Sequence, residues 1–156
     1  MPDVVAPPRA IPYDDLPESL HSQLGPTEWT PITQEQVAGF ADLTHDHQWI
    51  HVDEERARTG PFGTTIAHGY LTLSLVPYFL DQLLEVTGVS MAVNYGLEKV
   101  RFPAPVPVGS KVRAAAEIVD VSRRTGSTQV TLRVHLASDT TDRPVCVADV
   151  VILFTA

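Results

Sequence analysis

The stretch that decides the fold runs from His68 to Glu85 and reads HGYLTLSLVPYFLDQLLE. Apolar residues occupy nearly every side of a helix drawn through it, which is the pattern of a buried helix. Its most apolar part, Gly69 to Leu80, is shorter than the roughly 20 apolar residues that a membrane span needs. Pro77 removes one helical hydrogen bond and so predicts a kink. We therefore expect one long core helix.

Beyond Gly88 the pattern changes to that of strands. Apolar residues alternate in segments 89–102, 111–122, 128–138 and 145–154, and the short turns RTGS and DTTDRP favour antiparallel hairpins. The proline-dense segment FPAPVPVG is expected at a sheet edge or in a crossing connection. The predicted fold class is α+β, with one antiparallel sheet wrapped around one long central helix. The exposed edge of such a sheet predicts a homodimer.

Composition restricts the class of protein. The chain has 156 residues, 19% of them charged, and a net charge of −8, which argues against a nucleic-acid partner. The lone cysteine, Cys146, excludes an internal disulfide and fits a reducing compartment. The chain starts with acids and prolines and has no apolar signal segment there. We expect a cytoplasmic protein without a membrane partner.

The first half of the chain is divided by its prolines. Residues 1–27 are predicted to form an irregular, proline-rich extension, and residues 28–156 a single domain. Thr33 and Gln36 have capping-box spacing at the start of a short amphipathic helix that ends near residue 43. Asp53 is placed to cap a second short helix that ends before Gly60.

Between these helices lies the cluster THDHQWIHVD, residues 44–53, which is expected to be a non-helical loop. His47 and His51 have a spacing that binds zinc on a helix, but the loop position and the lack of a glutamate after His47 argue against a metal. His45 and His47 are expected to be solvated. His51 follows an apolar pair, Trp49 and Ile50, so it should lie at the edge of the core and titrate near neutral pH.

Two further residues complete a candidate acid–base site. Asp46 can face His51 across the loop, and their different surroundings can divide acid and base roles between them. Gly69 sits where the long helix begins, so its free N–H can hold a developing oxyanion. Neither Ser74 nor Cys146 has an evident base, and GxSxG and GxGxxG patterns do not occur.

The stretch FADLTHDHQWIHVDEERARTGPFGTTIAHGYLTLSL, with NYGLEKVRFPAPVPVGSKVR further on, resembles the MaoC-like family of (R)-specific enoyl-CoA hydratases and dehydratases. It is most similar to the single-domain subgroup that resembles nodulation protein N, from about Thr27 to the C-terminus. The resemblance implies a hotdog fold, a dimer, an acyl-CoA substrate and no cofactor. The implied reaction is the reversible hydration of a trans-2-enoyl-CoA to a (R)-3-hydroxyacyl-CoA.

The resemblance also implies residue roles. Asp46 and His51 stand where the family holds its catalytic water, and Gly69 stands where an N–H binds the thioester oxygen. Many members have glycine at position 45, and a glycine there can use backbone angles that histidine resists. The remaining predicted site residues are His68, Gln48 and Tyr70 for the substrate, and Lys99 and Arg101 for the phosphates of CoA, from a cationic group that also includes Lys111 and Arg113.

Two alternative functions remain open from the sequence. A hotdog acyl-CoA thioesterase would have the same fold and would release a free thiol. A non-catalytic subunit would bind acyl groups or a partner protein. The Asp46 and His51 pair argues against the second alternative without excluding it.

Overall fold

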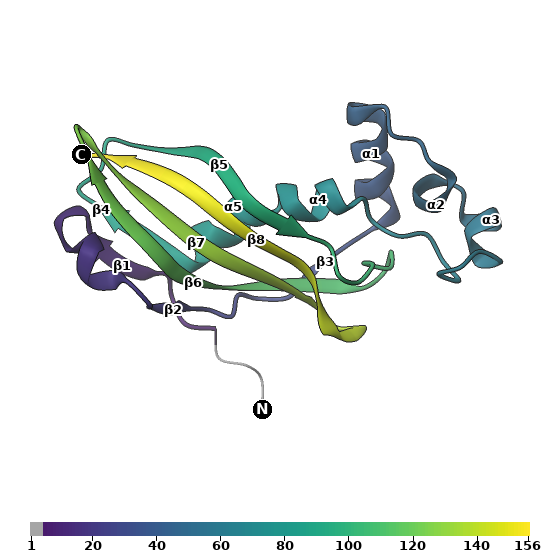
Figure 1. Cartoon of the computed structure of the whole chain (residues 1–156). Helices are drawn as coiled ribbons and strands as arrows, with labels where there is room; N and C mark the ends of the chain where they lie inside the picture. Colours follow the sequence, from purple (N-terminus) through teal and green to yellow (C-terminus); the bar gives the residue numbers. More distant parts are fainter. Residues whose placement is uncertain (1–4) are drawn as a thin grey trace.

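The computed structural model describes residues 5–156 and is drawn in Figure 1. Its main sheet has six strands in the order β2-β6-β7-β8-β5, with β3 also paired to β6, and every pairing in it is antiparallel. The strands are β2 (Gln23–Leu24), β3 (Thr30–Pro31), β5 (Met91–Arg101), β6 (Lys111–Arg124), β7 (Ser127–Ser138) and β8 (Thr141–Thr155). A separate parallel pair joins β1 (Arg9–Pro12) to β4 (Leu84–Thr87).

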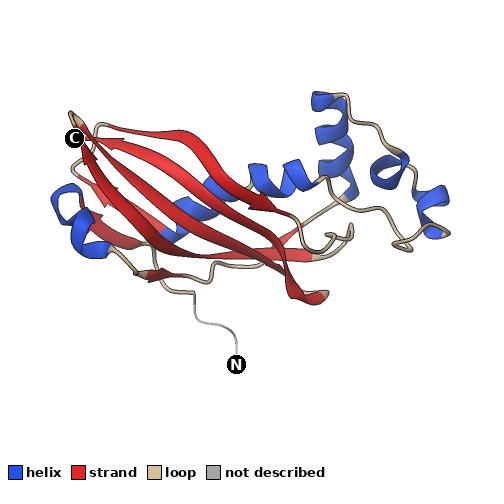
Figure 2. Cartoon of the chain, viewed as in Figure 1, coloured by secondary structure: helices blue, strands red, loops and turns tan. Residues whose placement is uncertain are grey.

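Helices lie along the curve of the sheet and near both of its ends (Figure 2). They are the 3₁₀-helix η1 (Tyr13–Ser19) and the α-helices α1 (Gln34–Thr44), α2 (Trp49–Val52), α3 (Glu54–Arg58), α4 (Gly69–Ser74) and α5 (Val76–Leu83). The predicted α+β class, one antiparallel sheet around a central helical segment, is confirmed. Among the described residues, no helix combines the length and the apolar run that a membrane crossing requires.

The predicted long helix is two helices, α4 and α5, separated at Leu75. Pro77 lies in the first turn of α5 and cannot donate a hydrogen bond to the preceding turn, so the helix is interrupted at Leu75, which itself keeps right-handed helical angles. The sheet-facing side buries Thr72, Val76, Phe79, Leu80 and Leu83, a spacing of one helical face.

Burial on nearly all sides of this helix is a wrong prediction for the isolated chain. Tyr70 is 72% exposed and Tyr78 is 52% exposed. The physical reason is geometric, because one sheet covers one side of a helix and the opposite side remains open. The sequence pattern therefore reports an apolar surface that the chain by itself does not cover.

Alternation along the strands places the rest of the core. On β7 the side chains of Val130, Leu132, Val134 and Leu136 are fully buried, as their spacing predicts. The proline-dense segment 102–110 connects β5 to β6, which are separated by β7 and β8 in the sheet. Its prediction as a crossing connection is confirmed.

The segment predicted as an irregular extension contains regular elements where it is described. Strand β2 pairs with β6, and β1 pairs with β4 next to the end of α5. Ile11, Leu16 and Leu24 are buried in the same core as the helix. These apolar side chains between the prolines tie the segment to the domain; residues 1–4 lie outside the described part of the chain.

Helices α1, α2 and α3 form a group beyond the end of the sheet (Figure 1). The predicted capping box of Thr33 and Gln36 is present at α1, and Asp53 caps α3 as expected. The prediction that the whole histidine cluster is non-helical is wrong for its second half. Residues Trp49–Val52 form the single helical turn α2, because burial of His51 and the bond from the Ile66 N–H to the Ile50 carbonyl hold the chain there.

Candidate active site

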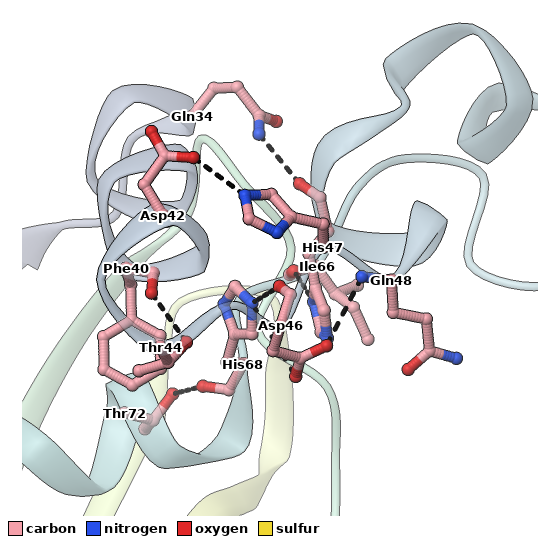
Figure 3. Close-up of polar contacts among 11 residues, drawn as sticks. Gln34, Phe40, Asp42, Thr44, Asp46, His47, Gln48, Ile66, His68 and Thr72 are labelled. Carbon is pink, nitrogen blue, oxygen red and sulfur yellow. Dashed lines mark hydrogen bonds and ion pairs between the residues drawn. The ribbon is translucent and has the colours of Figure 1, made fainter.

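Three side chains meet where the group of short helices adjoins the start of α4. One side-chain ligand atom from each of Asp46, His51 and His68 lies within 4.8 Å of the others. Asp46 belongs to the loop after α1 and His51 to α2, and His68 is the residue directly before α4. Figure 3 shows Asp46 and His68 facing each other across this junction. The fold thus brings the side chains of Asp46 and His51, the two predicted acid–base residues, close together.

His51 is held by two hydrogen bonds from different segments. Its ring Nδ1 lies 2.7 Å from the backbone oxygen of Ile66, and its own carbonyl accepts from the side chain of Gln34 at 2.8 Å. A carbonyl can only accept, so the hydrogen of the His51 ring is on Nδ1 and the lone pair is on Nε2. The side chain is therefore oriented as a proton acceptor.

Burial sets the acid–base property of His51. Loss of solvent lowers the pKa of this imidazole below its ordinary value, and the neighbouring His68 lowers it further. The hydrogen bond to Ile66 and the charge of Asp46 act in the opposite direction, but burial is the largest cause. His51 is consequently uncharged and able to accept a proton at neutral pH.

Asp46 is more exposed than its partners. Its side chain is 52% exposed, and its Oδ1 accepts a hydrogen bond of 3.3 Å from the backbone N–H of Gln48. The residue before it, His45, ends α1 with φ 63° and ψ 18°, the left-handed conformation that favours glycine. The family's glycine at this position thus has a physical reason, and histidine adopts the same angles here.

The three groups do not converge on a metal ion in this arrangement. The rings of His51 and His68 are stacked, with centroids 3.8 Å apart and an angle of 23° between their planes. The lone pair of an imidazole lies in the plane of its ring, so the lone pairs of two stacked rings lie in separate, nearly parallel planes, and one ion cannot lie in both. The pair His47 and His51, whose spacing suggested zinc, is not the group that the fold assembles, because His47 instead contacts Asp42 at 2.8 Å.

A pocket of about 340 Å³ opens beside His51. Gly69 forms part of its wall, and as the first residue of α4 its N–H has no acceptor within the helix. A Cβ at this position would lie 2.9 Å from the ring of Phe102, so any larger residue would require that ring to shift. The other lining residues are Phe62, Ile66, Ala67, Thr72, Phe102, Pro103, Ala104, Pro105, Val106 and Val145.

The wall from Phe102 to Val106 was missed by sequence reasoning. The prolines of this segment predicted a crossing connection, but the pattern did not indicate which site the connection passes. The signal that was available is the Phe102 side chain directly before the first proline, because an aromatic residue in a loop packs against something.

The other predicted substrate residues lie at different depths. His68 is buried within the cluster. Tyr70 is largely exposed, and its ring centroid lies 6.3 Å from that of Phe102. The side chain of Gln48 points away from the cluster in Figure 3. His45 and His47 are exposed, as predicted for a solvated loop.

The predicted cationic group is divided by the sheet. Lys99 and Arg101 lie on β5, and Lys111 and Arg113 lie on β6, with β7 and β8 between them. β5 and β6 are separated by three strand spacings of about 4.8 Å each. At that separation the two pairs cannot bind one phosphate together. Of the two pairs, Lys99 and Arg101 are nearer in sequence to Phe102 at the pocket wall.

Neither candidate nucleophile has the surroundings of an active one. Burial raises the pKa of the Cys146 thiol to about 11, which disfavours the reactive thiolate. The Ser74 hydroxyl donates to the Tyr70 carbonyl at 2.6 Å, within its own helix. The site therefore presents acid–base groups in place of an activated nucleophile.

A helix in the curve of an antiparallel sheet, with an acid–base pair at its start, defines the class of hotdog dehydratases. Residues 17–140 match the model of the MaoC like domain, and the chain belongs to that family. The predicted family and hotdog fold are confirmed.

Individual relatives agree with this assignment. The chain is 50% identical over 143 residues to 3-hydroxyacyl-thioester dehydratase Z of Mycobacterium tuberculosis, covering 91% of this chain and 95% of the relative. It is 41% identical over 138 residues to nodulation protein N of Rhizobium leguminosarum bv. viciae, covering 86% of each. The solved structure of the monoamine oxidase regulatory protein from Archaeoglobus fulgius aligns with a TM-score of 0.76 at 26% identity, covering 96% of this chain and 98% of that one.

The left-handed conformation of His45 yields a stability prediction. Replacing His45 by glycine removes the clash of a Cβ in that conformation, and this gain exceeds the extra chain entropy of glycine in the unfolded state. We expect His45→Gly to raise the free energy of unfolding by about 0.5–1 kcal/mol in urea denaturation. The matched change His47→Gly, in the same loop, should lower it slightly; equal effects at both positions would contradict the explanation.

Proposed function

We propose that the chain is a hydro-lyase that reversibly hydrates a trans-2-enoyl-CoA to a (R)-3-hydroxyacyl-CoA. The dehydration of a 3-hydroxyacyl thioester, named for the 50% identical relative, is the same reaction in the reverse direction. The observation that carries the proposal is the pair Asp46 and His51, held within 4.8 Å of each other at a pocket that Gly69 also lines. The reaction changes no overall oxidation state, so it needs proton transfer and no electron carrier.

The reacting water would lie between Asp46 and His51. Two hydrogen bonds of about 2.8 Å each, meeting at the water oxygen with a bent geometry, span a gap of this size. Asp46 orients the water as an acceptor of one hydrogen. His51 Nε2 takes the other proton as the oxygen forms its bond to Cβ, and that proton is returned to Cα on the same side, which regenerates the neutral imidazole.

Gly69 would stabilise the enolate that forms at the thioester oxygen. Its N–H is a free donor at the start of α4, with the positive end of the helix dipole behind it. Gly69 carries no side chain that would cover its N–H, and it lines the same pocket as His51. The carbonyl oxygen would accept from this N–H, with Cα and Cβ directed toward His51.

The two ends of the substrate would lie on opposite sides of this centre. The acyl chain enters the apolar part of the pocket, where Thr72, Val106 and Val145 are buried. The phosphates of CoA remain at the surface, and we place them near Lys99 and Arg101 at the end of β5. Arg101 is exposed, and the next residue, Phe102, belongs to the pocket wall.

A homodimer formed through β5 belongs to the same proposal. β5 is the last strand of the main sheet, and its residues Met91, Val93, Tyr95 and Leu97 are each at least 40% exposed. Grooves of about 300 and 180 Å³ lie between this strand and the open side of α4 and α5. A second copy would satisfy the free strand edge and cover the apolar surface at once.

The thioesterase and the non-catalytic subunit remain the alternatives. No nucleophile is activated among the described residues, but a thioesterase that uses water directly would need the same acid–base pair. The reaction product distinguishes the two enzymes, and activity of the purified chain distinguishes both from a binding subunit.

Loss of either acid–base residue tests the proposal. Crotonyl-CoA hydration is followed by the fall in absorbance of the conjugated thioester, with a parallel assay for free thiol. We expect Asp46→Asn and His51→Ala each to lower kcat/KM by about 10²–10⁴-fold, because each removes a proton-transfer or water-orienting group. The control His47→Ala, in the same loop, should stay within about twofold of wild type. Near-normal rates in either variant, or thiol release, would refute the assignment.

The lowered pKa of His51 predicts the pH dependence. The neutral ring is the active form for hydration, so falling pH removes activity only when the ring becomes protonated. Burial holds the pKa below its ordinary value of about 6.5, so the acid limb of kcat/KM should have its midpoint below that value. A midpoint above about 6.5 would contradict this environment for His51.

The proposed dimer is tested by sedimentation equilibrium. Wild type should have twice the chain mass of 17.0 kDa. The double change Val93→Lys and Leu97→Lys places four like charges at the paired edges and should shift the protein to the monomer. Asp142→Lys, at the exposed start of β8, is the control and should leave the mass unchanged. A wild-type monomer at micromolar concentration would disprove this part of the proposal.

A further inference from the structure

His68 is the buried residue of the cluster that the proposed reaction leaves without a role. Its side chain is 3% exposed, and it is absent from the described lining of the pocket that holds Gly69 and His51. The prediction that it contacts the substrate therefore lacks support from its position. Its contacts are with other protein groups.

The first of these contacts fixes the backbone next to the acid. His68 Nε2 lies 2.9 Å from the backbone oxygen of Asp46 and 3.9 Å from its carboxylate Oδ2. Because the carbonyl only accepts, the ring hydrogen is on Nε2 and points at Asp46. Figure 3 shows His68 between Phe40 and Asp46, so the ring is supported on the side away from the loop.

The second contact fixes the base. The His68 ring is stacked on that of His51 at 3.8 Å, while Phe40 packs against His68 with ring centroids 5.0 Å apart. Nδ1 of His68 is buried and has no hydrogen-bond partner among the described residues. Buried polar atoms normally have hydrogen-bond partners, and Nδ1 of His68 has none in this part of the chain. The orientation of the His68 ring is therefore explained by its bond to Asp46 and its stacking on His51.

We infer that His68 is a positioning residue that holds Asp46 and His51 at the separation of one water molecule. This inference rests on the proposed function and assigns His68 no contact with the substrate. Asp46 needs such support, since its own carboxylate is half exposed and its described side-chain contact within the loop is a single 3.3 Å bond. One ring joins the loop after α1, the turn α2 and the start of α4, the three segments that carry the site.

The size of the expected effect follows from geometry. A displacement of about 1 Å at a reacting centre costs on the order of 10²-fold in rate. Losing the contacts of His68 with Asp46 and His51, which we call the His68 clamp, should therefore lower kcat. KM should stay nearly unchanged, because the contacts with the thioester and the acyl chain remain in place. A substrate-contacting residue would instead raise KM.

Two substitutions separate the hydrogen bond from the stack. His68→Phe keeps a ring beside His51 and removes the donor to Asp46, and we expect kcat to fall about 10–100-fold with KM within about threefold. His68→Gln keeps an N–H donor and removes the ring, and we expect it to recover part of that loss. His47→Gln is the matched control in the loop and should stay within about twofold of wild type.

The second readout is the titration of the His51 ring by NMR, which needs no activity. The titratable groups that face His51 are Asp46 and His68, and the backbone oxygen of Ile66 is constant in all variants. Removing the His68 ring in His68→Gln both exposes His51 and removes a neighbour that lowers its pKa, so that pKa should rise. In His47→Gln it should stay unchanged.

The outcomes are distinct for the two proposals. If wild type hydrates no enoyl-CoA, the proposed function fails, and the NMR titration still tests the clamp. If folded His68→Phe and His68→Gln keep full kcat, or raise KM alone, His68 is not a positioning residue. An unmoved His51 titration in His68→Gln would overturn the inference as well. Circular dichroism establishes folding; kcat of His68→Phe and the His51 titration in His68→Gln are the two deciding measurements.

Discussion

The packing of α4 and α5 into the curve of the sheet is the constraint on which the other features depend. Phe79 and Leu83 face β-strands whose inward residues, such as Leu132, are fully buried. Because the helix is held there, its first residue, Gly69, is presented at the end of the sheet with a free N–H. The segment before the helix must then run along the crossing connection, where the Ala67 N–H donates to the Val106 carbonyl.

The placement of the helix brings a hydrogen-bond donor, the Gly69 N–H, close to a proton acceptor, the His51 ring. The Ile66 carbonyl, fixed beside the crossing connection, orients the His51 ring, and His68 at the helix start contacts Asp46. The Gly69 N–H and the His51 ring are thus both positioned by the same short segment, 66–69. A site built on one rigid segment needs few additional bonds to keep its distances.

On the edge strand β5, by contrast, residues with the apolar pattern of a buried strand are left exposed within one chain. Met91 and Tyr95 have the apolar character of a buried strand but are more than half exposed, as is Tyr78 on the open side of the helix. The apolar residues near the N-terminus are covered within the chain, since Leu16 and Ile11 are buried against the domain. Apolar surface is a property of sequence, whereas its cover depends on what the fold places beside it.

By itself, the sequence determined the class of fold, the capped helices, the inward face of the strands and the pair Asp46 and His51, because these depend on local periodicity, capping and spacing. Tertiary structure alone decided the single turn of α2 around His51 and the separation of Arg101 from Lys111 by two strands. It also decided that Phe102 forms the wall opposite Gly69 and that His68 stacks on His51. Contacts between residues 17 to 33 positions apart arise only when the chain folds back on itself, and no local pattern encodes them.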